Sequence, residues 1–363
     1  MKNKLRVLLL FGGQSCEHEV SVTSARSMLE AIDADTFELT LVGIAKSGNW
    51  YVVEDPTAVF GAGVVSEHCG IAVSLEYCSG ELKGRDGVDF TLAFDVVFPL
   101  LHGPHGEDGT LQGLLELAGA AYVGAGVVGS AVGMDKELMR RAFASAGLAQ
   151  TPWLTVRGRA WRGNPDAFVA ECESSLGYPV FVKPCNLGSS VGISKAHDRE
   201  QLITAIDTAL QYDYKAMVEQ SVENGREIEC SVLGNDEPEA SPCGEIIPGA
   251  EFYNYETKYI DDKSRLIIPA ELADEVAAKI RQAAITAFQS VEAFGLSRVD
   301  FLLDGNDNKI YINEINTMPG FTPISMYPKL WQAAGLEYAE LIRRLLELAL
   351  DRHGECQRIR TAG

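Results

Sequence analysis

Apolar positions along this chain recur with two different periods, and together they predict strands and helices in alternation. Positions 6–11 are apolar after Arg6 and end at Gly12-Gly13, which is typical of a buried strand and its turn. Strands that alternate with helices predict an α/β fold with a parallel sheet. Strands are predicted at 6–11, 37–44, 95–101, 153–156, 178–183, 217–219, 227–233, 245–247, 297–303 and 309–315, and helices at 20–32, 110–118, 135–146, 199–212, 271–294 and 338–352.

The pattern changes near Gly129 and again after Gly225, and this predicts three modules in a chain of 363 residues. Their boundaries are predicted as 1–133, 134–226 and 227–363. The strands at 227–233 and 245–247 are predicted to pair antiparallel, and an irregular aromatic segment follows at 252–262. Ligands of α/β sheets bind in the loops beyond the strand ends, so the polar loops are the candidate sites.

Composition narrows the possible partners. The formal net charge is -20, from 31 basic and 51 acidic side chains, which argues against nucleic acid and against an anionic membrane as partners. No apolar run approaches the ~20 residues of a membrane span, and the run at 5–11 is too short and too interrupted for a signal peptide. The eight cysteines are scattered without a Cys-x-x-Cys pair, which favours reduced thiols and a cytoplasmic location.

Three oxygen ligands are predicted to meet on the last two strands. Asp300 follows Arg298 by two positions, and Asn316 follows Glu314 by two, so each pair shares one strand face. If the strands pair through the turn between them, two carboxylates and an amide converge, which suits magnesium beside phosphate oxygens. Arg298 adds a fixed cation for a phosphate or an oxyanion. The alternative is an ordinary hairpin with a polar face.

Two glycine-rich segments have different interpretations. Lys183 on a strand and the loop 188–192, with Ser189 and Ser190, supply a cation, backbone N–H groups and hydroxyls for phosphates, although such a loop can also be a plain turn. The motif G-x-G-x-x-G at 124–129 matches a dinucleotide fingerprint, but the next strand ends at Arg157 instead of an acidic residue. We therefore interpret these glycines as a turn between modules.

Polar loops also follow two strands of the first module. Glu17, in the loop after the first strand, is placed either to bind an ammonium group or to remain solvated. His102 and His105 have His-x-x-His spacing, but they lie in a Gly/Pro loop without further zinc ligands, so a substrate-side role for His102 is the alternative to a metal site.

Taken together, these segments resemble the D-alanine–D-alanine ligases of the ATP-grasp family. The resemblance runs from about residue 6 to residue 352, and each motif is weak alone but specific in combination. It implies three α/β modules in the ATP-grasp architecture, with an N-terminal Rossmann-like domain and ATP held between the other two. The motifs are the loop after Gly12, His102-Gly-x-x-Gly-Glu-Asp-Gly, Met134-Asp-Lys136, Lys183 with Gly-Ser-Ser-Val-Gly, Glu219-Gln-Ser-Val222, Glu227, Thr257-Lys258-Tyr259, Arg298/Asp300 and Glu314/Asn316.

The resemblance also implies roles for individual residues. Glu17 takes the ammonium of the first D-alanine and forms, with Ser189 and Tyr259, a set that closes a loop over the site. Arg298 and the Gly320 N–H stabilise an oxyanion. His102 and Ser325 contact substrate, and Asp300, Glu314 and Asn316 hold the metal. ATP is contacted by Lys136, Lys183, Ser189, Ser190, Glu219, Val222, Glu227 and Lys258.

The reaction implied is ligation of two D-alanines through an acyl phosphate, for peptidoglycan precursor synthesis, with ATP and two Mg²⁺ ions per site, Mn²⁺ being an alternative. A homodimer is implied, and no nucleic-acid or membrane partner. Tyr259 favours an amine as the second substrate. Two alternatives stay open: a ligase of the same fold that uses D-lactate or D-serine, and a catalytically silent ATP-binding regulator.

Overall fold

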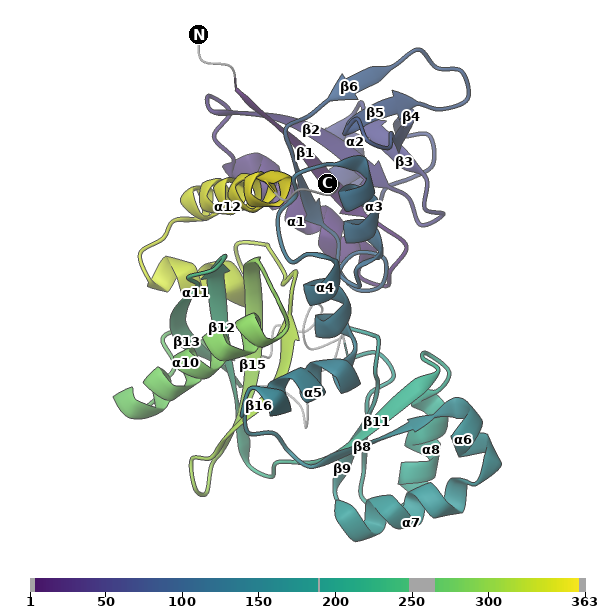
Figure 1. Ribbon diagram of the computed structural model, residues 1–363, viewed down its shortest axis with the longest axis vertical. Helices are drawn as coiled ribbons and strands as arrows, with labels where there is room; N and C mark the ends of the chain where they lie inside the picture. The colour runs from purple at the N-terminus through teal and green to yellow at the C-terminus, as the bar shows by residue number, and fades with distance from the viewer. Residues whose placement is uncertain (1–3, 189, 248–264, 359–363) are drawn as a thin grey trace.

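The computed structural model describes residues 4–188, 190–247 and 265–358, and within them three β-sheets carry helices on their faces (Figure 1). The three sheets follow one another along the chain. The module boundaries predicted at 133/134 and 226/227 stay predictions. Ser189, Lys258 and Tyr259, and the aromatic segment 252–262, lie outside the described residues.

The first sheet is mixed. Its strands lie in the order β6-β5-β4-β3-β2-β1-β7, with β1 parallel to both β2 and β7 and the other pairs antiparallel. The predicted parallel sheet is therefore found only at its β2-β1-β7 edge. The strands are β1 (Leu5–Gly12), β2 (Phe37–Ile44), β3 (Trp50–Val53), β4 (Gly70–Leu75), β5 (Glu81–Gly84), β6 (Thr91–Ala93) and β7 (Val96–Leu100).

Strand β1 is buried on both faces, which explains its unbroken apolar run. Leu9 and Phe11 face a core shared with α1 and α12, whereas Leu8 and Leu10 face a core shared with α3. The helices are α1 (His18–Ala31), α2 (Pro56–Ala62), α3 (Thr110–Ala118) and α12 (Tyr338–Arg358). The last helix of the chain thus packs against the first sheet (Figure 1).

The second sheet is antiparallel, with the strand order β10-β9-β11-β8. Val169, Leu202 and Ile206 on its helices are fully buried against it. The strands are β8 (Trp153–Arg157), β9 (Val180–Pro184), β10 (Ser194–Ala196) and β11 (Lys215–Gln220), and the helices are α6 (Gly158–Gly163), α7 (Pro165–Ser175) and α8 (Arg199–Ala209).

The third sheet is also antiparallel, in the order β14-β13-β12-β15-β16. The predicted pairing of the last two strands is confirmed. Its strands are β12 (Gly225–Gly234), β13 (Glu239–Ile247), β14 (Arg265–Ile267), β15 (Gly295–Asp304) and β16 (Ile310–Asn316), and helices α4 (Val127–Met134), α5 (Lys136–Ser145), α10 (Asp274–Ser290) and α11 (Met326–Ala333) pack near it.

The glycines at 124–129 include one turn residue and one packing residue. Gly124 has φ +100°, as the predicted turn requires. Gly129, however, lies inside α4, where an added Cβ would sit 2.4 Å from the carbonyl oxygen of Glu292. The glycine there allows the helix to approach the start of β15 closely.

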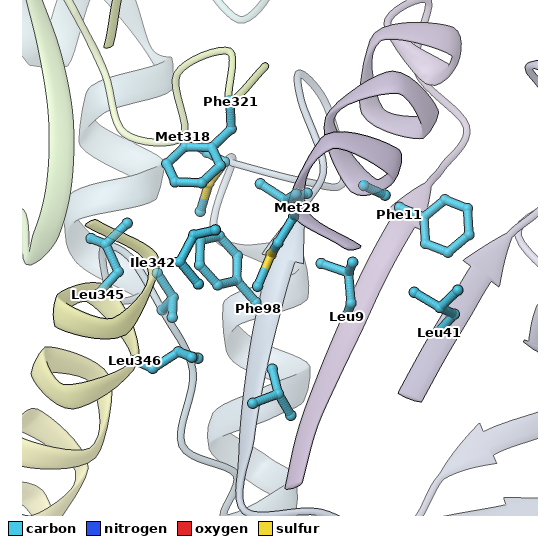
Figure 2. Packing of buried hydrophobic residues seen from close by; sticks show 14 of the residues in the cluster. Leu9, Phe11, Met28, Leu41, Phe98, Met318, Phe321, Ile342, Leu345 and Leu346 are labelled. Carbon is cyan, nitrogen blue, oxygen red and sulfur yellow. The ribbon is translucent and has the colours of Figure 1, made fainter. Parts of the chain in front are cut away.

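An aromatic and aliphatic core joins the first and third sheets (Figure 2). Phe321, just after β16, is fully buried, and its ring centroid lies 5.4 Å from that of Phe98 on β7. Ile342 and Leu345 of α12 and Met318 complete the contact. The loop after β16 is therefore held against the first sheet by packing. None of the helices within residues 4–358 that the structure describes is both long and apolar enough to cross a membrane.

Candidate functional site

The two polar loops of the first sheet start side by side, because β1 and β7 are parallel neighbours with Phe11 opposite Leu100. Ser21 fixes their relation: its hydroxyl accepts a hydrogen bond of 2.7 Å from the Gly12 N–H and contacts the Leu100 carbonyl. Glu17, at the start of α1, is only 7% exposed. The loops with Glu17 and His102 therefore share one edge of the sheet.

His102 has one ring nitrogen bound to the protein and the other without a donor from the part of the chain that the structure describes. Its Nδ1 lies 3.0 Å from the carbonyl oxygen of Met318, and since a carbonyl only accepts, Nδ1 carries the proton. Its Nε2 is buried without a hydrogen-bond partner among the described residues. A cavity of about 190 Å³ that His102 lines with Ser15 and Leu101 adjoins this position. The free lone pair suits a donor on a substrate.

Glu107, from the same loop as His102, also binds Met318, which follows the last strand of the third sheet. Its two oxygens accept backbone N–H groups of Gly103 at 2.8 Å and of Met318 at 3.3 Å. Both the N–H and the carbonyl of Met318 are thus held by one loop. Removal from water, and then the charge of Glu17, raise the pKa of Glu107 to about 8.

The loop after β9 reaches Glu17. A Cβ built at Gly103 would sit 3.0 Å from the Glu17 carboxylate, and one built at Gly188 would sit 3.3 Å from it. Glycine at both positions leaves room for this carboxylate. The structure therefore brings Glu17, the His102 loop and the Gly/Ser loop together, and the neighbouring Ser190 has φ +57°.

Lys183 on β9 is buried, and its charge is paired within the protein. It forms an ion pair with Glu219 on β11, which also pairs with Arg140 of α5. Burial favours the neutral acid, but Arg140 and Lys183 outweigh it and lower the pKa of Glu219. The carboxylate predicted to meet adenine is therefore occupied by two cations.

Lys136, the first residue of α5, contacts residues of the second-sheet loop and of the third sheet. Its Nζ donates to the Leu187 carbonyl at 2.8 Å and lies 3.9 Å from Glu314 on β16. Beside it, buried Lys215 of β11 binds Asp135 at 2.8 Å and Glu137 at 2.7 Å. Burial lowers the pKa of Lys215, but these two carboxylates raise it above the ordinary value. The ion pairs fasten β11 to the start of α5.

The predicted oxygen ligands converge on the third sheet. Asp300 lies opposite Glu314, and Arg298 lies opposite Asn316, so all four side chains share one face. Asn316 Nδ2 donates to Asp300 at 3.1 Å, which directs the amide oxygen elsewhere. Arg298 grips both Asp300 oxygens at 2.7 Å.

A β-bulge follows Asp300, where the register of β16 slips by one residue and leaves Asn313 without a partner on β15. Asn313 then accepts a hydrogen bond of 3.2 Å from Lys183. The Lys183–Asn313 and Lys136–Glu314 contacts join the faces of the second and third sheets. The site thus brings Lys183 of the second sheet and Lys136 of α5 against the polar side chains of the third sheet, a junction that we call the cleft.

The remaining predicted residues border this cleft or the substrate loops. Val222 lies in the connection between β11 and β12, and Glu227 begins the polar face of β12. Gly320 and Ser325 are neighbours after β16: a Cβ at Gly320 would sit 3.0 Å from the Ser325 hydroxyl. That hydroxyl accepts the Thr322 N–H at 3.1 Å at the start of α11.

Comparisons with known proteins agree with this architecture. Sequence models described as the N-terminus and the C-terminus of D-ala D-ala ligase match residues 6–125 and 142–347. D-alanine–D-alanine ligases of Acetivibrio thermocellus and Heliobacterium modesticaldum are 46% and 48% identical to it, over 98% of this chain and 98% and 97% of those proteins.

Solved structures are equally similar. The D-alanine–D-alanine ligase of Coxiella burnetii aligns with a TM-score of 0.84 and 38% identity, covering 98% of this chain and 96% of that one. The VanG D-Ala:D-Ser ligase of Enterococcus faecalis aligns at 0.85 and 33%, covering 96% and 100%. The fold is that of the ATP-grasp enzymes, preceded by an N-terminal α/β domain. Within that class, the chain belongs to the D-alanine–D-alanine ligase family.

Proposed function

We propose that this chain is an ADP-forming ligase that joins two D-alanines with the energy of ATP, for peptidoglycan precursor synthesis. Family membership supports the reaction. The observation that carries the chemistry is that Lys136 contacts Glu314 and Lys183 contacts Asn313, beside the opposed carboxylates Asp300 and Glu314. This arrangement suits a polyphosphate held with divalent cations.

The donor set fits Mg²⁺. Asp300 and Glu314 lie opposite each other, Asn316 adds an amide oxygen, and all are hard oxygen donors. Among the described residues no cluster of three or more His, Cys, Asp or Glu side chains is arranged around a metal position, so phosphate oxygens are needed to complete coordination. We propose two Mg²⁺ ions per site, replaceable by Mn²⁺, which supply charge neutralisation between the carboxylate and the γ-phosphate.

ATP is proposed to lie in the cleft. Lys136 and Lys183 contact phosphates, and Ser189, Ser190 and Lys258 add donors from the loops. Val222 and Glu219 border adenine, with Glu219 also holding Lys183 in place. Glu227, at the start of β12, is positioned for the ribose hydroxyls.

The first D-alanine is proposed to bind at the shared edge of the loops of the first sheet. Glu17 takes its ammonium group, and His102 offers the bare Nε2 lone pair. The substrate carboxylate attacks the γ-phosphate, and ADP leaves. Ser189 and Tyr259 are proposed to join Glu17 in closing the site, which keeps water from the acyl phosphate.

In the second step the amine of the other D-alanine attacks the acyl phosphate. Ser325 is proposed to hold that substrate's carboxylate beside the Gly320 N–H. The tetrahedral oxyanion is stabilised by Arg298 and Gly320, and each such donor is worth about 3 kcal/mol. Collapse of the intermediate expels phosphate. Tyr259 is proposed to favour the amine over a hydroxy acid.

We propose that the protein is cytoplasmic and acts as a homodimer. We would measure phosphate release from MgATP with D-alanine alone, and then with D-lactate or D-serine added, and identify the products by mass. D-alanyl-D-alanine formed with D-alanine alone supports the proposal. Release that requires D-lactate or D-serine would transfer the same chemistry to another second substrate. ATP binding without turnover would leave a regulator.

A further inference from the structure

Three carboxylates form a row across the third sheet. Glu229 of β12 lies opposite Asp300 of β15, and Asp300 lies opposite Glu314 of β16. Residues opposite each other on antiparallel strands place their side chains on the same face, so the row continues the proposed metal site inward by one strand. Glu229 is 5% exposed, and a buried carboxylate requires a cationic partner or strong donors.

Arg298 supplies that partner, and it is shared. Its Nε lies 2.7 Å from an Asp300 oxygen and 3.0 Å from Glu229 Oε2, while a second nitrogen grips the other Asp300 oxygen at 2.7 Å. Nε has a single proton, which cannot serve two carboxylates fully at once. The guanidinium is therefore divided between a residue of the proposed metal site and a residue beside it.

Asp300 cannot bind Arg298 with both oxygens and ligate a divalent cation at the same time. A bidentate guanidinium uses both of its oxygens, whereas a divalent cation needs at least one of them in direct contact. Glu229 already contacts the Nε side of Arg298 at 3.0 Å. Glu229 is therefore placed to keep Arg298 when Asp300 turns to the cation.

We propose that Glu229 is a positioning residue for the ligase reaction: it holds the Nε side of Arg298 while Asp300 ligates the metal, so that the other guanidinium N–H groups face the reacting oxygens. The inference rests on the proposed function. Without the charge of Glu229, Arg298 stays on Asp300 and competes with the divalent cation. Metal affinity and turnover are therefore both expected to depend on a residue that touches neither metal nor substrate.

The test uses the full chain with Glu229→Gln, which preserves volume and removes charge. Mn²⁺ binding in the presence of ADP is followed by the electron paramagnetic resonance of free Mn²⁺. Groups that orient metal ligands commonly change affinity or activity by about 10- to 100-fold, so Mn²⁺ affinity is expected to fall by at least about tenfold. The kcat is expected to fall similarly, with partial recovery at high Mg²⁺.

Glu245→Gln is the matched control. Glu245 is also buried, on neighbouring β13, and binds Arg226 at 2.6 and 2.7 Å outside the cleft. This variant is expected to lose thermal stability while keeping parental Mn²⁺ affinity. Equal weakening of Mn²⁺ binding in both variants would assign the effect to general destabilisation and overturn the proposal.

A double variant separates positioning from folding. Adding Arg298→Gln to Glu229→Gln removes the competing cation together with its partner, so Mn²⁺ affinity is expected to return towards the parental value while kcat remains low. Parental affinity and kcat in Glu229→Gln alone would overturn the role of Glu229. Failure of the proposed function has a different signature, because the unmodified chain itself would then give no D-alanyl-D-alanine.

Discussion

Replacing Glu314 by Gln tests the metal site with the least structural disturbance. The side chain keeps its length, lies opposite Asp300 across the last strand pair, and is 24% exposed. Lys136, whose Nζ is 3.9 Å away, pairs with it, and Arg298 on the neighbouring strand also feels its charge. The change therefore removes one negative charge from a place where attraction and repulsion nearly balance.

The balance can be worked from the distances. At an effective dielectric constant of about 20, charges 3.9 Å apart attract by about 4 kcal/mol. Two carboxylates on directly opposed residues, about 5 Å apart, repel by about 3 kcal/mol. Loss of these two contacts changes the free energy of unfolding by about 1 kcal/mol, and loss of the attraction to nearby Arg298 adds to it. The metal, in contrast, supplies several kcal/mol to the transition state, equivalent to about 10³-fold in rate.

We expect Glu314→Gln to lower kcat by about 10³-fold or more, while the ligand-free melting temperature moves by less than about 4 °C. Product is measured by mass at saturating MgATP and D-alanine, and melting by differential scanning fluorimetry. Glu340→Gln on α12, which removes an exposed partner of Arg343, is the control and should retain both properties. Turnover within tenfold of the parent would refute the assignment of Glu314 as a metal ligand.

Three further changes address other parts of the molecule. Lys183→Met should raise the KM for ATP by about 10- to 100-fold, because a charged hydrogen bond contributes about 1.5–3 kcal/mol, and an unchanged KM in steady-state assays would contradict its contact with phosphate. Phe321→Ala should reduce the free energy of unfolding in urea by about 3–5 kcal/mol, since the ring is fully buried between Phe98 and Tyr338; a loss below about 1 kcal/mol would show that this core does not join the sheets. Burial, and then the charge of Glu17, raise the pKa of Glu107 to about 8, against about 4.3 in the unfolded chain. The contribution of Glu107 to stability is therefore complete below about pH 4 and is lost as the pH rises through about 8. Glu107→Gln should flatten the decline in melting temperature between about pH 5 and 8, and parallel curves for variant and parent would contradict this.

The pairing that forms the candidate metal site could be predicted from spacing alone. Residues two apart in a strand share a face, and the short turn between the last strands leaves one simple way to pair them. Asp300 and Glu314 are indeed opposite each other. The bulge that directs Asn313 to Lys183 was not predicted, although the spacing of three between buried Ile312 and Ile315 breaks the alternation of a regular strand and was its only signal.

Residues that act through another side chain escaped the sequence analysis for a different reason. Glu229 and Arg140 are isolated charges in otherwise ordinary strand and helix sequences, and their partners are 69 and 79 positions away in the chain. For Glu107 the sequence did hold a signal of a role near the site, since it follows His102 within one polar loop. What was not visible is its contact with Met318, which depends on how the first and third sheets pack.

Among the described residues, the cations of the cleft have carboxylate partners within the protein: Lys183 has Glu219, Lys136 has Glu314, and Arg298 has Asp300 and Glu229. Buried unpaired charges would destabilise the ligand-free protein, so these ion pairs let it fold with the site assembled. MgATP must then exchange partners. In the proposed site, Asp300 and Glu314 would hold the divalent cation, and Arg298 and Lys136 would then be free to bind oxyanion and phosphate. Because each half of the ligand would free groups that bind the other half, we expect the ion pairs that stabilise the ligand-free cleft to make metal and nucleotide bind cooperatively.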